Sequence, residues 1–169
     1  GPFPSFAEGF KSLGFNYAYL IEQDLRNGGC CGVKDNPWDA FEKLLNGEII
    51  LTAAVYKTEL SKYKKTWESI SDDTKQVLEL LSRFEIDSET MKEWIDDSDW
   101  YEDLINNPYL LSEESPYGGV TPEMVDLGVI ADPDIQGKFI PKRPSCIETK
   151  IDERRVRALV IHKLIVQSE

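Results

Sequence analysis

The chain has 169 residues, a net charge of −12 and 41% hydrophobic residues, including four tryptophans. This apolar content is enough for a buried core and excludes wholesale disorder; no apolar run approaches the roughly 20 residues that cross a bilayer. Residues 66–136 carry 19 acidic and three basic side chains, whereas residues 137–169 carry eight basic and four acidic ones. A domain that binds nucleic acid over its whole surface is excluded, because such domains are dominantly basic. Phosphate contacts are expected only in patches.

Helical patterns begin close to the N-terminus. Apolar side chains at three- and four-residue intervals predict helices over 4–13 and 15–26, and the GGCCG run that follows ends the second one. Cys30 and Cys31 are adjacent, a spacing poorly suited to bonding each other or to sharing a zinc ion. With Cys146 they are expected to be reduced thiols, as in an intracellular, cytoplasmic protein without a structural metal.

The stretch DNPWDAFEKLLNG predicts a third helix. Asn36 is expected to cap it, Pro37 to occupy its first position, and Gly47 to follow its last residue. Residues 49–57 are rich in β-branched side chains and fit either a strand or a helix. We predict a helix, because their surroundings are helical.

A pair of helices is predicted over 59–70 and 72–83. Ser71 is expected to cap the second of these, and acidic side chains follow in its first turn, where they suit the helix dipole. An apolar stripe along this helix is expected to enter the core; it consists of Val77, Leu78, Leu81 and Phe84.

Four further segments complete the pattern. A helix capped by Asp87 or Ser88 runs through Trp94, and another runs from Ser98 through Leu104. Thr121 is expected to cap a helix that Gly128 ends. The last element is a helix from about residue 152 to 166, after a proline-rich connector without periodicity.

These elements predict an all-α fold, an array of short helices with helix-hairpin-helix-like units and a long irregular connector before the last helix. The expected organisation, in chain order, is a scar of expression-tag removal (1–2), an N-terminal helical subdomain (3–70), a helical-hairpin subdomain (71–128), the connector (129–150) and a basic helix (151–169).

No motif for catalysis is found. Phosphate loops of the GxxxxGK[ST] and GxGxxG types are missing from the sequence, so we expect no nucleotide hydrolysis by these residues. A catalytic triad would have to use His162, which lies in an apolar run and is expected to be structural. The acidic run 96–103 lacks the regular spacing of a calcium loop and is expected to be a solvated surface. We therefore predict a non-catalytic chain without metal or cofactor.

One of two basic segments surrounds two aromatic residues. Lys57, Lys62, Lys64 and Lys65 could pair with phosphates, while the interleaved Tyr63 and Trp67 could stack on bases. These two rings are four residues apart and share a helix face, which is equally typical of core packing.

The second basic segment is the predicted last helix, DERRVRALVIHKL. Arg154, Arg155 and Arg157 spread around more than half of its circumference. The apolar residues between and after them indicate that one side of this helix is packed and not exposed to solvent.

Several phrases resemble the region that precedes the motor in RecD-like superfamily 1 DNA helicases. They are the hairpin around residues 71–95, NNPYLLSEES with Asn107, Pro108, Tyr109, Leu110, Leu111 and Glu113, then GVTPEMVDLGVI, and finally IDERRVRALVIHKL. Their order and approximate spacing agree over roughly 90 residues, and the first 65 residues match less recognisably. A departure is the turn Arg83-Phe84-Glu85-Ile86-Asp87, which lacks the glycine that lets a hairpin backbone approach a phosphate.

The resemblance implies an accessory region of an ATP-dependent DNA helicase that serves DNA repair. Its partners would be DNA and a motor domain of the same chain, and ATP and Mg²⁺ would be bound elsewhere in the parent protein. The arginine helix would join the array to the motor. The DNA contacts expected are Lys62, Lys64, Lys65, Arg154, Arg155 and Arg157. The alternative hypothesis is a protein-interaction module, in which the acidic segment 85–103 docks a basic partner or another domain.

Overall fold

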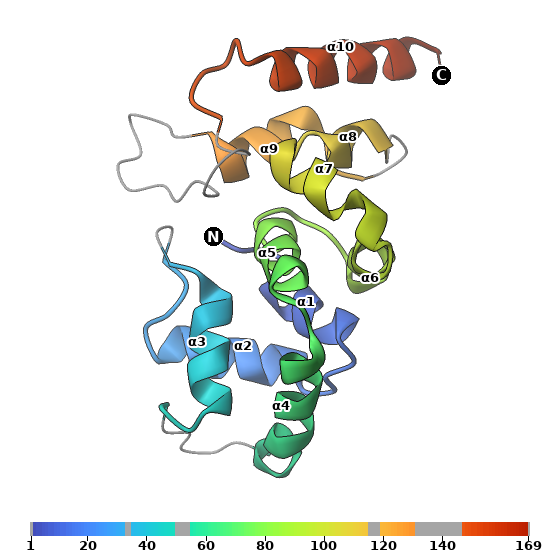
Figure 1. Ribbon diagram of the computed structural model, residues 1–169. Helices are drawn as coiled ribbons and strands as arrows, with labels where there is room; N and C mark the ends of the chain where they lie inside the picture. The colour runs from blue at the N-terminus through green and yellow to red at the C-terminus, as the bar shows by residue number, and fades with distance from the viewer. Residues whose placement is uncertain (1, 33–34, 50–54, 115–118, 131–146, 169) are drawn as a thin grey trace.

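The computed structural model describes residues 2–32, 35–49, 55–114, 119–130 and 147–168. Over these ranges the chain is all-α, as predicted, and contains no β-strand. The helices stack along one long direction, with α4 at one end and α10 lying across the other (Figure 1). Their bounds are α1 Phe6–Ser12, α2 Ala18–Asn27, α3 Pro37–Leu45, α4 Leu60–Ser69, α5 Asp72–Leu81, α6 Ser88–Asp96, α7 Tyr101–Asn106, α8 Leu110–Glu114, α9 Pro122–Val129 and α10 Glu153–Ser168, with 3-10 turns η1 (Lys57–Glu59) before α4 and η2 (Ser98–Trp100) before α7.

The predicted caps are confirmed. Asn36, Ser71 and Thr121 begin α3, α5 and α9, and each side chain accepts a hydrogen bond from a backbone N–H two or three residues further on. Of the two alternatives for α6, Asp87 is the cap. Such caps satisfy backbone donors that the first helical turn leaves without partners.

Aromatic rings hold the N-terminal helices together. Trp38 of α3 and Trp67 of α4 stack with ring centroids 5.4 Å apart, and Phe15 meets Tyr63 of α4 at 4.4 Å. Tyr63 and Trp67 are 2% and 3% exposed. Of the two interpretations of these residues, core packing is therefore the one that the structure supports, and neither ring is available to stack on a base.

Helix α5 connects the N-terminal helices to the later ones within one continuous core. All four members of the predicted apolar stripe are buried. At the end of α5, Ser82 accepts a hydrogen bond from the indole nitrogen of Trp38 at 3.0 Å, and Ser5 donates one to the Leu81 carbonyl at 2.9 Å. Residues on both sides of position 70 thus share one core.

A buried ion pair between Glu79 of α5 and Arg83, just past the end of this helix, was not predicted. Arg83 donates from Nε to the Glu79 carboxylate at 2.9 Å and from Nη1 to the Gly128 carbonyl at 3.0 Å. The two side chains are 4% and 11% exposed. Burial raises the pKa of the Glu79 carboxyl to about 7, against the lowering effect of the Arg83 charge.

Two expectations on chain organisation fall mostly on residues that the structure does not describe. The predicted helix over 49–57 falls mostly on residues 50–54, which are not described; Val55 and Tyr56 form a turn before η1. Residues 131–146 of the predicted connector, with Cys146, are also outside the described ranges. Ile130 and Ile147 pair as an isolated parallel bridge, which brings the two ends of this segment together.

Gly128 does not end its helix, contrary to the prediction, because α9 continues to Val129. Its role is to permit close packing: a Cβ atom on Gly128 would lie 2.5 Å from Cε1 of Phe84 and 3.2 Å from Cβ of Arg83. Glycine is unfavourable inside a helix, so the close contact with Phe84 and Arg83 is the reason for a glycine at this position.

We expect Gly128→Ala to lower the free energy of unfolding by about 1–3 kcal/mol, because overpacking outweighs the higher helix propensity of alanine. Chemical denaturation measures this. Leu127→Ala, at a neighbouring position that is 71% exposed, is the control and should change stability by no more than about 0.5 kcal/mol. A more stable Gly128→Ala variant would contradict the close packing.

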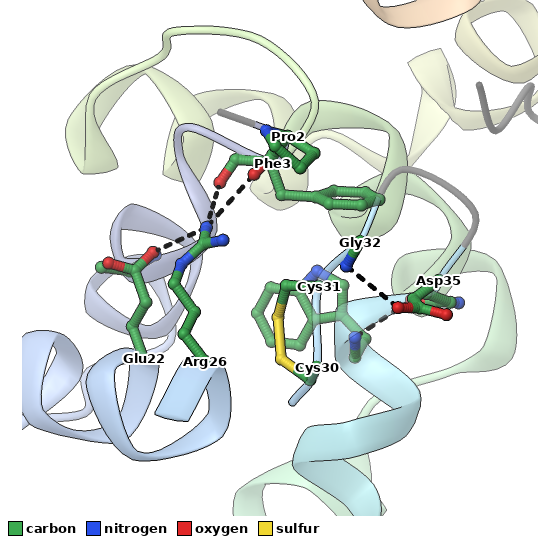
Figure 2. The surroundings of a disulfide bond; sticks show 11 residues. Pro2, Phe3, Glu22, Arg26, Cys30, Cys31, Gly32 and Asp35 are labelled. Carbon is green, nitrogen blue, oxygen red and sulfur yellow. Dashed lines mark hydrogen bonds and ion pairs between the residues drawn. A yellow bond between two sulfur atoms is a disulfide. The ribbon is translucent and has the colours of Figure 1, made fainter. Parts of the chain in front are cut away.

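The adjacent cysteines are joined, contrary to the expectation of reduced thiols: a disulfide links Cys30 and Cys31 (Figure 2). Glycines flank the pair, and Cys31 itself has a φ of 77°. The Gly32 N–H donates to the Asp35 carboxylate at 2.9 Å, which fixes the turn. The expectation from spacing fails because Cys31 itself takes a left-handed backbone conformation, which non-glycine residues rarely adopt.

Candidate nucleic-acid interface and the arginine helix

The lysines of the first basic segment lie on the outer side of η1 and α4. Lys57, Lys62 and Lys65 are exposed and Lys64 is half-buried, whereas Tyr63 and Trp67 on the opposite side anchor the helix in the core. In the described part of the chain none of the four lysines forms an ion pair; the lysines that do are Lys11, Lys75 and Lys92.

The last helix, α10, lies over α8 and α9 (Figure 1). Among its described side chains only Ala158 is buried. Val156, Val160 and Leu164 are 44%, 53% and 61% exposed. The described residues do not cover this stripe, so the predicted packing of the apolar side is not met within this part of the chain, and α10 is fixed mainly by polar contacts of its first turns.

Arg155 makes the best-defined of these contacts. Its Nε and Nη2 donate to the two carboxylate oxygens of Asp126 on α9, both at 2.9 Å, and its Nη1 donates to the Lys150 carbonyl at 2.9 Å. The buried Tyr109 hydroxyl donates to the same carboxylate. The hydrogen bonds from Arg155 to Asp126 raise the pKa of the Arg155 guanidinium. Burial, and after it the hydrogen bond from Tyr109 to Asp126, raises the pKa of the Tyr109 hydroxyl.

The other two arginines also meet acceptors of the chain. Arg154 donates to both carboxylate oxygens of Asp152, at 2.9 and 2.8 Å, and to the Asn106 carbonyl at 2.7 Å. These contacts lower the pKa of Asp152. Arg157, 68% exposed, lies 3.3 Å from the nearly buried Glu113 carboxylate of α8. We call Asp126, Tyr109 and Arg155, together with the Arg154 and Arg157 contacts, the arginine clamp.

The structure thus separates the predicted site residues into two sets. Lys62, Lys64 and Lys65 lie together on α4, and the three arginines lie together on α10, at the opposite end of the molecule (Figure 1). The two sets do not form one continuous basic surface. Arg155 and Arg157 instead meet Asp126 and Glu113 of the same chain, partners that sequence reasoning missed.

Three of the four phrases that carry the helicase resemblance meet at the clamp. NNPYLLSEES contributes Tyr109 and Glu113, TPEMVDLG contributes Asp126, and DERRVRAL contributes the arginines. Segments distant in the sequence therefore serve one structural purpose, which is to hold α10 on α8 and α9.

The hairpin turn without glycine buries its apolar side chains and exposes its carboxylates. Phe84 and Ile86 are buried, Glu85 is exposed, and the Asp87 carboxylate accepts the Thr90 N–H at 2.7 Å. Exposed carboxylates at this turn would repel a phosphate group.

Comparison with known proteins finds no matching family model, curated sequence or solved structure. Among the described residues, no cluster of histidine, cysteine and carboxylate side chains could hold a metal ion. A search of the same residues finds no helix with the length and hydropathy needed to cross a bilayer.

Proposed function

We propose that this chain is a non-catalytic accessory module of a RecD-like DNA helicase, and that it binds the DNA backbone through the lysines of α4. The observation that carries the DNA contact is the set of unpaired, outward-facing lysines on a helix whose aromatic side is locked in the core. Because the helix is already fixed in place, its backbone loses little conformational entropy when the lysines bind.

Charge balance limits this contact to a patch. Glu59 and Glu68 lie on the same segment as the lysines, and the later helices carry most of the excess negative charge. We therefore expect binding to be weak, non-specific in sequence and strongly dependent on salt.

Under this proposal the arginines are structural and do not contact DNA. Arg155 would have to give up a two-bond contact with Asp126 to reach a phosphate. The clamp holds α10 so that its exposed stripe of Val156, Val160 and Leu164 faces outward. That stripe is where the proposal places the motor domain, which would supply ATP and Mg²⁺ binding.

The test is a fluorescence anisotropy titration of labelled single-stranded and duplex DNA between about 50 and 200 mM salt. We expect Lys62→Ala/Lys64→Ala/Lys65→Ala to abolish most binding and to lower the log–log salt slope by about two to three units, because each phosphate contact contributes about 0.7–0.9.

The matched control is Lys11→Ala/Lys92→Ala/Lys163→Ala, which changes the net charge by the same amount at distant positions. This variant should bind DNA nearly as the wild type does. Equal losses in both triple variants, or no binding by the wild type at the lowest salt, would contradict a specific role of α4.

A second candidate function is the docking of a basic partner by the acidic segment 85–103. It is favoured by the exposure of its carboxylates on α6, η2 and α7, including Glu93, Asp97 and Glu102. Absence of DNA binding at low salt would favour this function over the first.

A further inference from the structure

A pocket of about 200 Å³ lies between α6, η2 and the end of α8. Two tryptophans form its apolar walls: the rings of Trp94 and Trp100 have centroids 5.7 Å apart and planes inclined by 71°. Both are half-buried, so each ring leaves part of its surface open. The full lining is Thr90, Glu93, Trp94, Asp97, Trp100 and Glu114.

Every charged group of this lining is a carboxylate. Glu93, Asp97 and Glu114 are all exposed. The nearest lysine in sequence, Lys92, does not line the pocket and is paired with Asp96 at 2.6 Å. A hollow with negative charge at its rim and indole rings in its walls is complementary to a cationic side chain, which the faces of the rings attract through their quadrupoles.

A second, smaller hollow continues from the first. It shares Thr90 and Trp94 with the pocket, and its lining also includes Glu85, Asp87 and the apolar Ile86 and Leu111. Its carboxylates extend the negative surface beyond the tryptophans, so an extended segment with more than one positive charge fits better than a single small cation.

We propose that the pocket between Trp94 and Trp100 binds an arginine side chain of a basic peptide segment in a partner protein. The guanidinium stacks on an indole face, since Arg is the residue best suited to such stacking, and the carboxylates of Glu93, Asp97 and Glu114 neutralise its charge. Neighbouring basic residues of the peptide lie along Glu85 and Asp87. The inference rests on the second candidate function, docking of a basic partner by residues 85–103, and gives it a specific ligand. The site is distinct from the lysines of α4 and does not depend on DNA binding.

The experiment is isothermal titration calorimetry with the peptide acetyl-Gly-Arg-Gly-Arg-Gly-amide. The same peptide with citrulline in place of arginine keeps the shape of the side chain and removes its charge. We expect saturable binding of the arginine peptide at low salt and none of the citrulline peptide.

Two variants separate the pocket from the general acidity of the chain. Trp100→Leu leaves the net charge unchanged, and Glu93→Gln/Asp97→Asn/Glu114→Gln keeps the shape of the rim; each should weaken binding about tenfold or more. The control Glu48→Gln/Glu68→Gln/Glu123→Gln changes the charge equally at exposed distant positions and should weaken it much less. Far-UV circular dichroism confirms that each variant is folded.

Equal affinity of Trp100→Leu and the wild type would show that the peptide binds by charge alone, and would overturn the proposal. Absence of binding by the wild type, or equal losses in the rim variant and its distant control, would overturn it as well. If Trp100→Leu fails to fold, the comparison of Glu93→Gln/Asp97→Asn/Glu114→Gln with its distant control still tests the proposal.

Discussion

Arg83→Met is expected to lower the free energy of unfolding by about 3–5 kcal/mol, the cost of leaving one member of a buried ion pair alone. The substitution strands the Glu79 carboxylate and removes the donor to the Gly128 carbonyl. Since domains are stable by only about 5–15 kcal/mol in total, this is a large fraction. Urea denaturation at neutral pH measures it.

The difference in free energy of unfolding between Arg83→Met and the wild type should become smaller as the pH is lowered. Burial already raises the pKa of Glu79 to about 7 in the presence of Arg83, and removing that positive charge raises the pKa further. Between this folded pKa and the unfolded value near 4.5, the folded state binds a proton that the unfolded state does not, so stability rises as the pH falls. Denaturation at about pH 8 and about pH 5.5 tests the sign.

The double variant Glu79→Met/Arg83→Met provides the control. It replaces the pair by apolar side chains of similar length, which is often neutral or stabilising in buried sites. We expect it to recover much of the loss and to lose the pH dependence. If Arg83→Met were as stable as the wild type at both pH values, Glu79 would not be buried.

Asp126→Ala is expected to free α10 from the rest of the protein. The substitution leaves Arg155 and the buried Tyr109 hydroxyl without their common acceptor, which should cost about 2–4 kcal/mol of local stability. Hydrogen exchange measured by mass spectrometry should show faster exchange in residues 153–168 and unchanged exchange in α1–α5.

Glu123→Ala, on the same helix but exposed and outside the clamp, is the control for Asp126→Ala and should leave α10 protected. Combining Asp126→Ala with Arg155→Met should cost less than the sum of the single changes, because the two residues contact each other. Slow exchange of α10 in Asp126→Ala would contradict the clamp.

Local signals in the sequence predicted most helices correctly. Asn36, Ser71 and Thr121 begin their helices because a cap depends only on neighbours a few residues away. Gly128 was misinterpreted because its role depends on Phe84, a residue that only the tertiary fold brings near. The Cys30–Cys31 disulfide depends in the same way on the backbone geometry of one turn.

The partners of the arginines depend on tertiary structure. The chain has 31 acidic residues, and nothing local marks Asp126 as the one that meets Arg155. The Glu79–Arg83 pair did leave a signal, its i,i+4 spacing on one helix, but that spacing is also common on exposed helix surfaces and does not indicate burial. The position of the α4 lysines on one helix could be predicted, because it depends only on the helix over residues 59–70.

The division of roles between α4 and α10 can be tested by recording amide ¹H–¹⁵N spectra of the intact chain while single-stranded DNA is added. The account predicts shifts for residues 57–69 around the lysines, with the signals of residues 153–168 unchanged. Shifts centred on Arg154, Arg155 and Arg157, or no shifts in α4 at low salt, would contradict it.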